Sequence, residues 1–181
     1  MDMEKKYDFT DEMKVFGDIT LRRIVALRDF GDVKAGDKGG WIEKEENLSQ
    51  DGNAWVCGDA RVCGDAWVCG DARVCGDARV YGDAWVCGEA RVCGNARVCG
   101  DARVCGDAHV ASESDYIVFK NFWSSGRYFT YTFSNRMWKV GCFYGTGEEL
   151  IKKAYADSED SGWHYEQAVR YAEAAERRRK K

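Results

Sequence analysis

Small apolar residues recur at a strict period of six through the middle of the chain. From Asp51 to Val110 the sequence reads as ten consecutive units of the form Gly-Asp-Ala-x-Val-Cys. In each unit the alanine and the valine lie two residues apart, so both point to one face of an extended strand and the residue between them points away. Glycine and aspartate supply the turn that follows. This pattern predicts a stacked coil with three flat faces, one turn for every three units, and an interior of alanine and valine.

The same spacing continues upstream of the repeat. Ile42, Leu48 and Ala54 are also six residues apart, so we expect them to extend the alanine column and the coil to begin near Trp41. Larger residues would then fill its open end. On this reading the coil contains twelve units in about four turns, a stack of roughly 19 Å at about 4.8 Å per turn.

The outward residues sort into columns because every third unit returns to the same face. One face carries Trp55, Arg73, Arg91 and His109; the second carries Arg61, Arg79 and Arg97; the third carries Trp67, Trp85 and Arg103. The residues after the valines form three more columns: Cys57, Cys75 and Cys93; Cys63, Tyr81 and Cys99; Cys69, Cys87 and Cys105.

Two of these columns predict a binding surface. Exposed tryptophan and arginine are favoured anchors of interfaces, and the third column predicts a flat aromatic strip edged by positive charge. The second column offers guanidinium groups, which recognise phosphates and carboxylates. The candidate binding residues are therefore Trp67, Trp85, Arg103, Arg61, Arg79 and Arg97. The alternative is that ladders of like residues merely stabilise the stacked turns.

The flanking segments predict caps, because the ends of a solenoid expose an apolar cross-section. We expect a frayed polar start up to Lys6 and two or three short strands between Tyr7 and Lys38, the strongest at Ile19 to Leu27. After Val110, three aromatic-rich segments predict an antiparallel meander: Tyr116 to Trp123, Arg127 to Phe133 and Met137 to Tyr144.

Two helices are expected to follow the meander. The first runs from Glu148 to Ser158, with Leu150, Ile151, Ala154 and Tyr155 on one face, and the second runs from Gly162 to about Arg178. The chain is thus expected to be mainly β, with an N-terminal β cap (1–40), a parallel β-helix of about four coils (41–111), and a C-terminal α+β segment of a β-meander and two helices (112–181).

Composition and charge exclude several classes of protein. The net charge of -4 over 181 residues is too small to indicate a nucleic-acid or membrane partner. The repeat carries nine acidic residues against six arginines, which is too balanced for a mimic of DNA. The sequence has no apolar run of about 18 residues and no signal peptide. These features favour a soluble protein in the cytoplasm of a bacterial host cell.

Eight of the nine cysteines follow the repeat, and Cys142 stands apart. Their spacing matches neither a disulfide framework nor a Cys-x-x-Cys metal site. Successive turns bring cysteines within disulfide range, but in-register stacking suits the dihedral angle of a disulfide poorly. We therefore expect reduced thiols and no metal site, with soft-metal binding by a thiol ladder as the alternative.

The periodicity resembles that of the hexapeptide-repeat proteins, which have an aliphatic residue every six positions and a small residue two before it. The resemblance covers about a third of the chain and implies a left-handed coil, since the spacing alone carries no hand. Many proteins of this class are acetyl- or acyltransferases, and the resemblance would then imply a trimer, a catalytic histidine and acyl-CoA bound between subunits.

The repeat lacks the features of those enzymes. Its ten units run without an inserted loop, and the chain has only two histidines, His109 and His164. His109 takes an arginine position in the last turn, and two histidines cannot form a three-histidine zinc site. We therefore expect no enzymatic activity, no catalytic residue and no cofactor, with an acyl- or acetyltransferase as the alternative.

Residues 27–49, the Gly-Asp-Ala-Arg-Val array and residues 138–155 together resemble hexapeptide-repeat proteins of bacteriophages and prophages. This resemblance leads to the function expected here: a non-enzymatic binding module of phage or prophage origin that blocks or sequesters a host component. The expected partner is a host protein, such as a defence protein, or a nucleotide-like signal. A homo-oligomer is expected, and a structural self-assembling coil is a further alternative.

Overall fold

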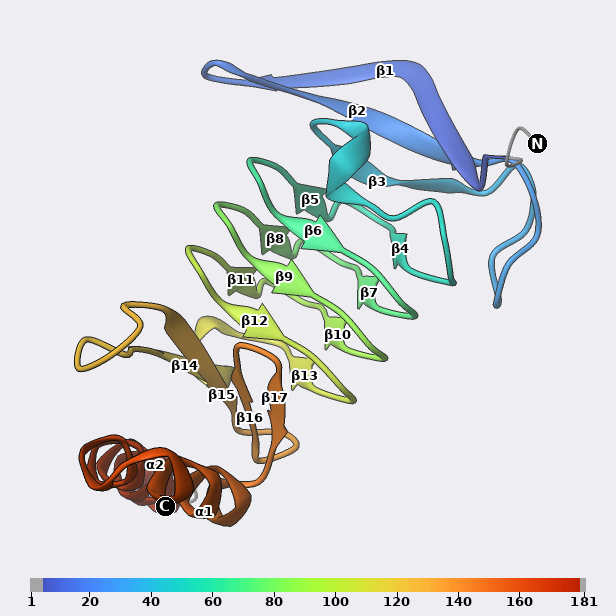
Figure 1. Cartoon of the computed structure of the whole chain (residues 1–181). Coiled ribbons are helices and arrows are strands. Elements are labelled where there is room, and N and C mark those ends of the chain that lie inside the picture. The colour runs from blue at the N-terminus through green and yellow to red at the C-terminus, as the bar shows by residue number, and fades with distance from the viewer. Residues whose placement is uncertain (1–4, 180–181) are drawn as a thin grey trace. The chain divides into compact units, whose positions relative to one another are not determined.

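The computed structural model describes residues 5–179, which form two units (Figure 1). The first unit extends to Glu113 and contains the repeat; we call it the solenoid unit. The second begins at Ser114 and contains an antiparallel sheet and two helices; we call it the C-terminal unit. A parallel β-solenoid with strands at its N-terminal end, and a meander followed by two helices, confirms the expected fold class.

Each repeat unit contributes one two-residue strand to the solenoid. The strands are Trp55–Val56 (β4), Arg61–Val62 (β5), Trp67–Val68 (β6), Arg73–Val74 (β7), Arg79–Val80 (β8), Trp85–Val86 (β9), Arg91–Val92 (β10), Arg97–Val98 (β11), Arg103–Val104 (β12) and His109–Val110 (β13). They stack in parallel on three faces, in the orders β13-β10-β7-β4, β5-β8-β11 and β12-β9-β6 (Figure 1).

The interior of the coil is made of the repeated alanines and valines, which are all buried. Successive turns are joined by regular backbone hydrogen bonds. The Trp55 N–H donates to the Ala72 carbonyl at 2.9 Å, and the Cys57 N–H donates to the Val74 carbonyl at 2.9 Å. Because this bonding repeats at each turn, the outward side chains of one face come to lie directly above one another.

An antiparallel hairpin extends one sheet of the solenoid beyond its first turn. Strands β1 (Tyr7–Phe16) and β2 (Ile19–Ala26) pair with each other, and β2 pairs with β3 (Lys38–Ile42), which joins β5 in parallel. The sheet therefore has six strands, in the order β1-β2-β3-β5-β8-β11. The region expected to hold short strands thus contains strands of ten and eight residues.

The expectation of a frayed start was wrong for Lys6, whose side chain is fully buried, and its remainder at residues 1–4 lies outside the described residues. Its Nζ donates to the Ala54 carbonyl at 2.9 Å and lies 3.4 Å from the Asp51 carbonyl. Burial, together with the charge of Arg28, lowers the pKa of Lys6 to about 8. The ammonium group satisfies carbonyl groups of the first turn that have no earlier turn to bond to.

The expected phase of the first turn was wrong. Ile42 and Leu48 do not continue the alanine column: they pair with Val62 and Val68, 20 residues on, whereas later turns pair at 18. The corner after Leu48 is longer by two residues. The side chain of Gln50, in this corner, accepts a hydrogen bond from the backbone N–H of Lys6 at 2.8 Å. The longer corner therefore contacts the start of the hairpin. The side chains of Ile42 and Leu48 consequently fill valine positions in the core.

The C-terminal unit is a four-stranded antiparallel sheet in the order β14-β15-β16-β17. Its strands are Tyr116–Lys120 (β14), Tyr128–Thr132 (β15), Met137–Val140 (β16) and Phe143–Gly145 (β17), after a short 3-10 turn at Glu113–Asp115. The third segment expected as one strand is therefore two. Gly141, with φ of 56°, makes the turn between them.

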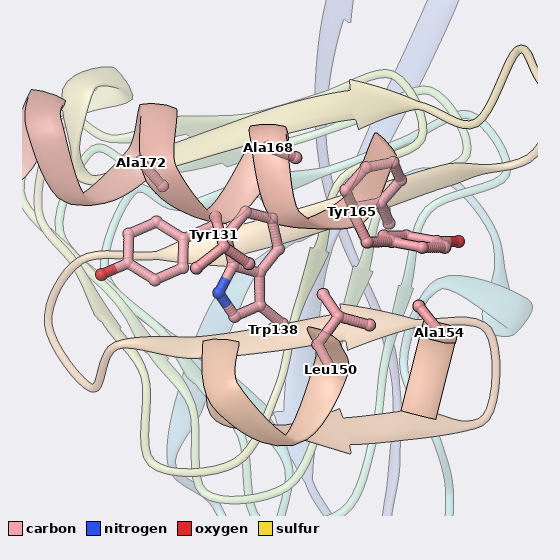
Figure 2. Close-up of a cluster of buried hydrophobic side chains, with 9 residues drawn as sticks. Tyr131, Trp138, Leu150, Ala154, Tyr165, Ala168 and Ala172 are labelled. Carbon is pink, nitrogen blue, oxygen red and sulfur yellow. The ribbon is translucent and has the colours of Figure 1, made fainter. Parts of the chain in front are cut away.

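Two helices follow the sheet, α1 (Gly147–Asp157) and α2 (Glu159–Arg179). The start of α1 is set by a capping box, in which the Glu149 N–H donates to Thr146 Oγ1 at 3.3 Å and Glu149 accepts from the Thr146 N–H at 2.8 Å. The second helix begins earlier than expected. Both helices pack on the sheet around a core of Phe129, Tyr131, Trp138, Leu150, Ala154, Tyr165, Ala168, Val169 and Ala172 (Figure 2).

Candidate functional site

The strand register confirms the three columns of outward residues. Arg61 pairs with Arg79 and Arg79 with Arg97; Trp67 pairs with Trp85 and Trp85 with Arg103. These two columns belong to different sheets. The six candidate residues therefore make two separate surfaces and not one combined site.

The column of Arg61, Arg79 and Arg97 forms one wall of a cavity of about 260 Å³, which we call the arginine cavity. The β1–β2 hairpin, which belongs to the same sheet, adds the apolar side chains of Phe16, Ile19 and Leu21 to the lining. Cys63 and Tyr81 complete the lining. The hairpin thus adds apolar side chains to a row of arginines, and together they line a cavity that remains open to solvent.

The arginine cavity holds more positive charge than its neighbours neutralise. Arg97 pairs with Glu113 at 3.4 Å. Asp59, at the corner before Arg61, is paired with Lys14 at 2.9 Å instead. Among residues 5–179, Arg61 and Arg79 form no ion pair, and Arg61 lies 4.1 Å from the centre of the Phe16 ring. Two guanidinium groups therefore face the cavity without a carboxylate.

The phenol of Tyr81 and the thiol of Cys63, which also line the cavity, have raised pKa values that favour their neutral forms. A hydrogen bond with Cys99, then burial, raises the pKa of Tyr81. Burial, then the charge of Glu43, raises the pKa of Cys63. The cavity therefore presents arginine cations and neutral donors, a combination that suits an anion.

The second surface differs from the flat strip that was expected. The rings of Trp67 and Trp85 meet edge to face, with centroids 5.2 Å apart and planes at 85°. Arg103 lies over the Trp85 ring at 4.6 Å. Trp85 is 37% exposed and Trp67 is half-buried. This packing stabilises the ladder itself and leaves a smaller aromatic area for a partner.

The remaining face carries Trp55, Arg73, Arg91 and His109 in register. Trp55 does not reach solvent, because Tyr7 and Phe30 cover it and leave 2% exposed. Arg73 forms an ion pair with Asp32. Burial, then the neighbouring charge of Arg91, lowers the pKa of Arg73.

This face is bordered on one side by thiols and on the other by carboxylates. A cavity of about 420 Å³ lies along the column of Cys57, Cys75 and Cys93. A second cavity of about 560 Å³ lies along the corner residues Asp71, Glu89 and Asp107. In the first, Cys93 Sγ is 3.1 Å from His109 Nε2. The sequence sorting had placed His109 in one column and Cys93 in another, and the spacing does not encode the contact between them.

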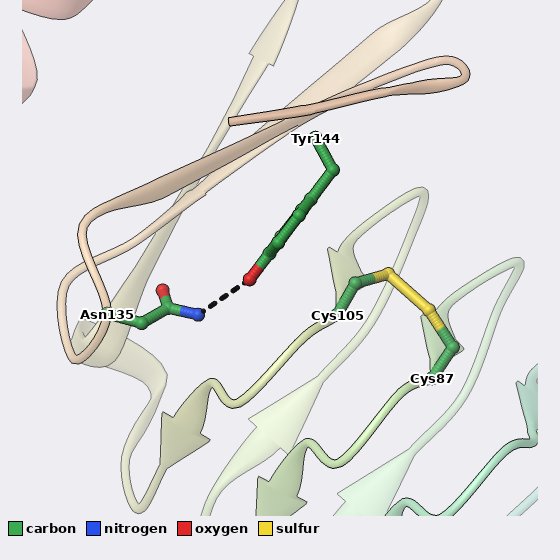
Figure 3. The surroundings of a disulfide bond; sticks show 4 residues. All are labelled: Cys87, Cys105, Asn135 and Tyr144. Atoms are coloured by element: carbon green, nitrogen blue, oxygen red, sulfur yellow. Dashed lines mark hydrogen bonds between the residues drawn. A yellow bond between two sulfur atoms is a disulfide. The ribbon is translucent and has the colours of Figure 1, made fainter. Parts of the chain in front are cut away.

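The expectation of reduced thiols throughout was wrong. Cys87 and Cys105 form a disulfide between successive turns of the third column, with Cα atoms 4.7 Å apart (Figure 3). The stacked turns already bring equivalent Cα atoms within the range of a disulfide, so the in-register stacking does not prevent the bond. Cys57 remains a thiol, and burial, then Cys75, raises its pKa to about 11.

A further cavity of about 460 Å³ lies within the C-terminal unit, beside Tyr131, Arg136 and Glu176. Its charges pair internally, since Arg136 bonds Glu176 at 2.8 Å. Burial raises the pKa of Tyr131 to about 12. Nearby, Asn135 donates to the Tyr144 hydroxyl at 3.1 Å (Figure 3). These groups already bond one another, so this cavity is a weaker candidate than the arginine cavity.

Sequence reasoning missed the hairpin wall of the arginine cavity. Phe16, Ile19 and Leu21 were interpreted only as parts of a cap. The available signal was the apolar pair Val15-Phe16 beside the turn residues Gly17-Asp18. In the part of the chain that the structure describes, no cluster of three or more His, Cys, Asp or Glu could hold a metal ion. No helix there is long and apolar enough to cross a membrane.

Stacked parallel sheets built from a six-residue repeat define this chain as a β-solenoid repeat protein. Residues 72–88 and 90–106 match the family model described as YdcK Beta solenoid repeat. The chain is also similar to the "Uncharacterized acetyltransferase YdcK" of Escherichia coli (strain K12), with 40% identity over 60 residues. The similarity covers 29% of this chain and 18% of that protein, so the chain matches less than a fifth of its curated relative.

Proposed function

We propose that this protein is a non-enzymatic binding module and that the arginine cavity is its ligand site. The ligand class is a small anion with a flat or apolar part, as in a nucleotide. The observation that carries the proposal is one cavity lined both by apolar hairpin side chains and by Arg61 and Arg79, which have no carboxylate partner among the described residues.

Charge and geometry support an anionic ligand. Guanidinium groups bind phosphate and carboxylate oxygens in pairs of parallel hydrogen bonds. Successive turns of a solenoid repeat about every 4.8 Å, so the arginines offer evenly spaced sites along one line. The rigid backbone of the coil holds them in place before binding, which lowers the entropic cost of association.

The apolar wall supports a ligand that is more than a free anion. Phe16 presents an aromatic ring already in contact with the Arg61 guanidinium. A planar base could lie against that ring or replace it over the guanidinium. The volume of about 260 Å³ lies just below the range of about 300–1,000 Å³ common for small-molecule sites, which favours a small ligand over a protein segment.

The test is calorimetric titration with ATP, a cyclic dinucleotide and tripolyphosphate. Arg79→Gln should weaken nucleotide binding by about tenfold or more, the equivalent of one lost charge-assisted contact of about 1.4 kcal/mol or more. Arg103→Gln, on another face, is the matched control and should leave binding unchanged. Phe16→Ala should weaken the binding of the two nucleotides and leave the binding of tripolyphosphate unchanged. Equal affinities for the parent and Arg79→Gln would contradict the proposal, as would the absence of binding by all three probes.

The origin and target belong to the same proposal. The resemblance of residues 27–49 and 138–155 to phage and prophage proteins supports a module that sequesters a component of the bacterial host. A host protein or nucleotide signal in the host cytoplasm would be the target. A pull-down from bacterial lysate, with mass spectrometry of co-purifying proteins and small molecules, tests this part. Loss of the captured partner in Arg79→Gln would connect it to the arginine cavity.

An acyl- or acetyltransferase is the second candidate. The name of the Escherichia coli relative and the contact of His109 with Cys93 favour it, whereas the uninterrupted repeat does not. Acetyl-CoA turnover that is lost in His109→Ala would establish this candidate and displace the binding module.

A further inference from the structure

We infer that Cys93 and Cys75, with His109 and Arg91, form a dithiol site that exchanges with small anionic disulfides. The inference does not depend on the arginine cavity, which lies on another face. It rests on a thiol–imidazole contact, a cavity that opens onto that contact, and a second thiol one turn away.

The Cys93 thiol has a base beside it. Cys93 Sγ lies 3.1 Å from His109 Nε2, within reach for transfer of the thiol proton when Nε2 is the unprotonated nitrogen. Cys93 directly follows β10, and His109 belongs to β13, which pairs with β10 in register one turn further on. The solenoid backbone therefore holds the two residues on adjacent turns.

The cavity beside this pair selects for negative charge. Arg73 and Arg91 both line it, and Asp32, which also lines it, pairs with Arg73. Arg91 forms no ion pair within residues 5–179. Its guanidinium group can therefore hold the carboxylate of an incoming disulfide and stabilise a thiolate at Cys93.

Cys75 is placed to complete the exchange. Cys75 and Cys93 directly follow β7 and β10, which pair in parallel, and the Cys75 N–H donates to the Val92 carbonyl at 2.9 Å. Cys87 and Cys105 have the same relation in the next column, where the Cys87 N–H donates to the Val104 carbonyl at 2.9 Å and the sulfurs are bonded. The solenoid thus accommodates a disulfide between thiols one turn apart.

Cys57, at the other end of the column, is a poor nucleophile. Burial keeps its pKa near 11, so it stays protonated at neutral pH. The reactive end of this column is consequently the one beside His109.

The exchange balances in two steps. Cys93 gives its proton to His109 Nε2 and attacks one sulfur of the disulfide R–S–S–R; a Cys93–S–S–R bond forms, and RS⁻ leaves and takes up a proton. Cys75 then loses its proton to water and attacks the Cys93 sulfur, which forms Cys75–Cys93 and releases the second RS⁻. Two protein thiols are oxidised, and one small disulfide is reduced to two thiols.

The experiment uses protein purified without reductant, in a Cys142→Ser background that removes an exposed thiol. The probe is 5,5′-dithiobis(2-nitrobenzoate), a dianionic disulfide, and stopped-flow absorbance follows the released thiolate. We expect a fast phase of two equivalents and a Cys75–Cys93 disulfide by peptide mapping. Cys75→Ser should release one fast equivalent and retain the adduct on Cys93. Cys93→Ser should lose the fast phase, and the matched control Cys99→Ser should keep it.

Two further variants separate chemistry from folding. His109→Asn should slow the fast phase about tenfold with an unchanged circular dichroism spectrum. Arg91→Gln should slow the reaction with the anionic probe more than the reaction with the neutral disulfide 2,2′-dithiodipyridine. A Cys75–Cys93 disulfide already present in the purified protein also supports the inference. A fast phase that persists in Cys93→Ser, or adducts mapped to other thiols in the parent, would overturn it.

Discussion

Replacing Gly88 by alanine should destabilise the solenoid more than the same change at Gly100. Both glycines occupy equivalent corners and have positive φ, 69° and 60°. They differ in what lies one turn away. A Cβ at Gly88 would meet the Gly106 nitrogen at 2.8 Å, whereas a Cβ at Gly100 would meet nothing within 4 Å.

The magnitudes follow from these two situations. An L-residue in the left-handed region costs about 1–2 kcal/mol, and this term applies at both corners. At Gly88 the new methyl group also contacts backbone, which cannot rotate away, so the turns must separate and their hydrogen bonds lengthen. Overpacking of this kind adds about 1–3 kcal/mol. We expect a total loss of about 2–5 kcal/mol for Gly88→Ala and about 1–2 kcal/mol for Gly100→Ala.

Equilibrium unfolding in urea, followed by far-ultraviolet circular dichroism, measures both losses from the shift in midpoint at a constant m-value. Gly100→Ala is the matched control for the backbone conformation. Equal losses in the two variants would refute the reasoning, because contact between turns would then contribute nothing beyond the strain in φ.

Three other predictions follow from the buried lysine, the helix cap and the tryptophan ladder. Because the folded pKa of Lys6 is lowered to about 8, the unfolded chain binds more protons above that pH, so this group makes stability rise as pH increases from about 8 to 9.5, by at most about 2 kcal/mol. Urea unfolding of Lys6→Met should lack this contribution, and an identical pH slope in both proteins would contradict it. Thr146→Ala removes a capping box and should cost the C-terminal unit about 1 kcal/mol in thermal unfolding, whereas the exposed control Lys152→Ala should cost less. If the expected homo-oligomer forms through the tryptophan ladder, the double variant Trp67→Ala/Trp85→Ala should keep the circular dichroism spectrum of the coil but lose self-association in light scattering, since an aromatic anchor contributes about 2 kcal/mol or more. Self-association at the level of the parent would place the contact surface elsewhere.

Much of the fold is predictable because the repeat encodes it redundantly. Every unit repeats the same alanine, valine and corner glycine, so the faces, the sheets and the columns follow from one spacing. The first turn does not follow, because its longer corner is fixed by long-range contacts: Gln50 bonds the backbone of Lys6, 44 residues away. A six-residue periodicity cannot predict a hydrogen bond between residues so far apart in the sequence.

The candidate site is predictable only in part for the same reason. The spacing brings Arg61, Arg79 and Arg97 into one column, but the hairpin that lines the cavity with them has no periodic relation to the repeat. Side-chain rotation is a second limit. The columns place Trp67 beside Trp85, and Cys87 beside Cys105, without fixing whether the rings stack or whether the sulfurs bond.

The reversal of strand direction at the hairpin limits the length of the solenoid. The end of a stack of parallel turns offers a row of backbone donors and acceptors to any further strand, including one from another molecule. In the six-stranded sheet this row is used by β2, and the outermost strand is β1, whose register breaks between Phe9 and Met13 around the charged pair Asp11 and Glu12. An irregular, charged edge is a poor template for another turn. Nothing in the repeat sequence itself prevents a further turn from stacking on the first one. The hairpin therefore defines the end of the stack on this face and suppresses the growth of fibres from that end.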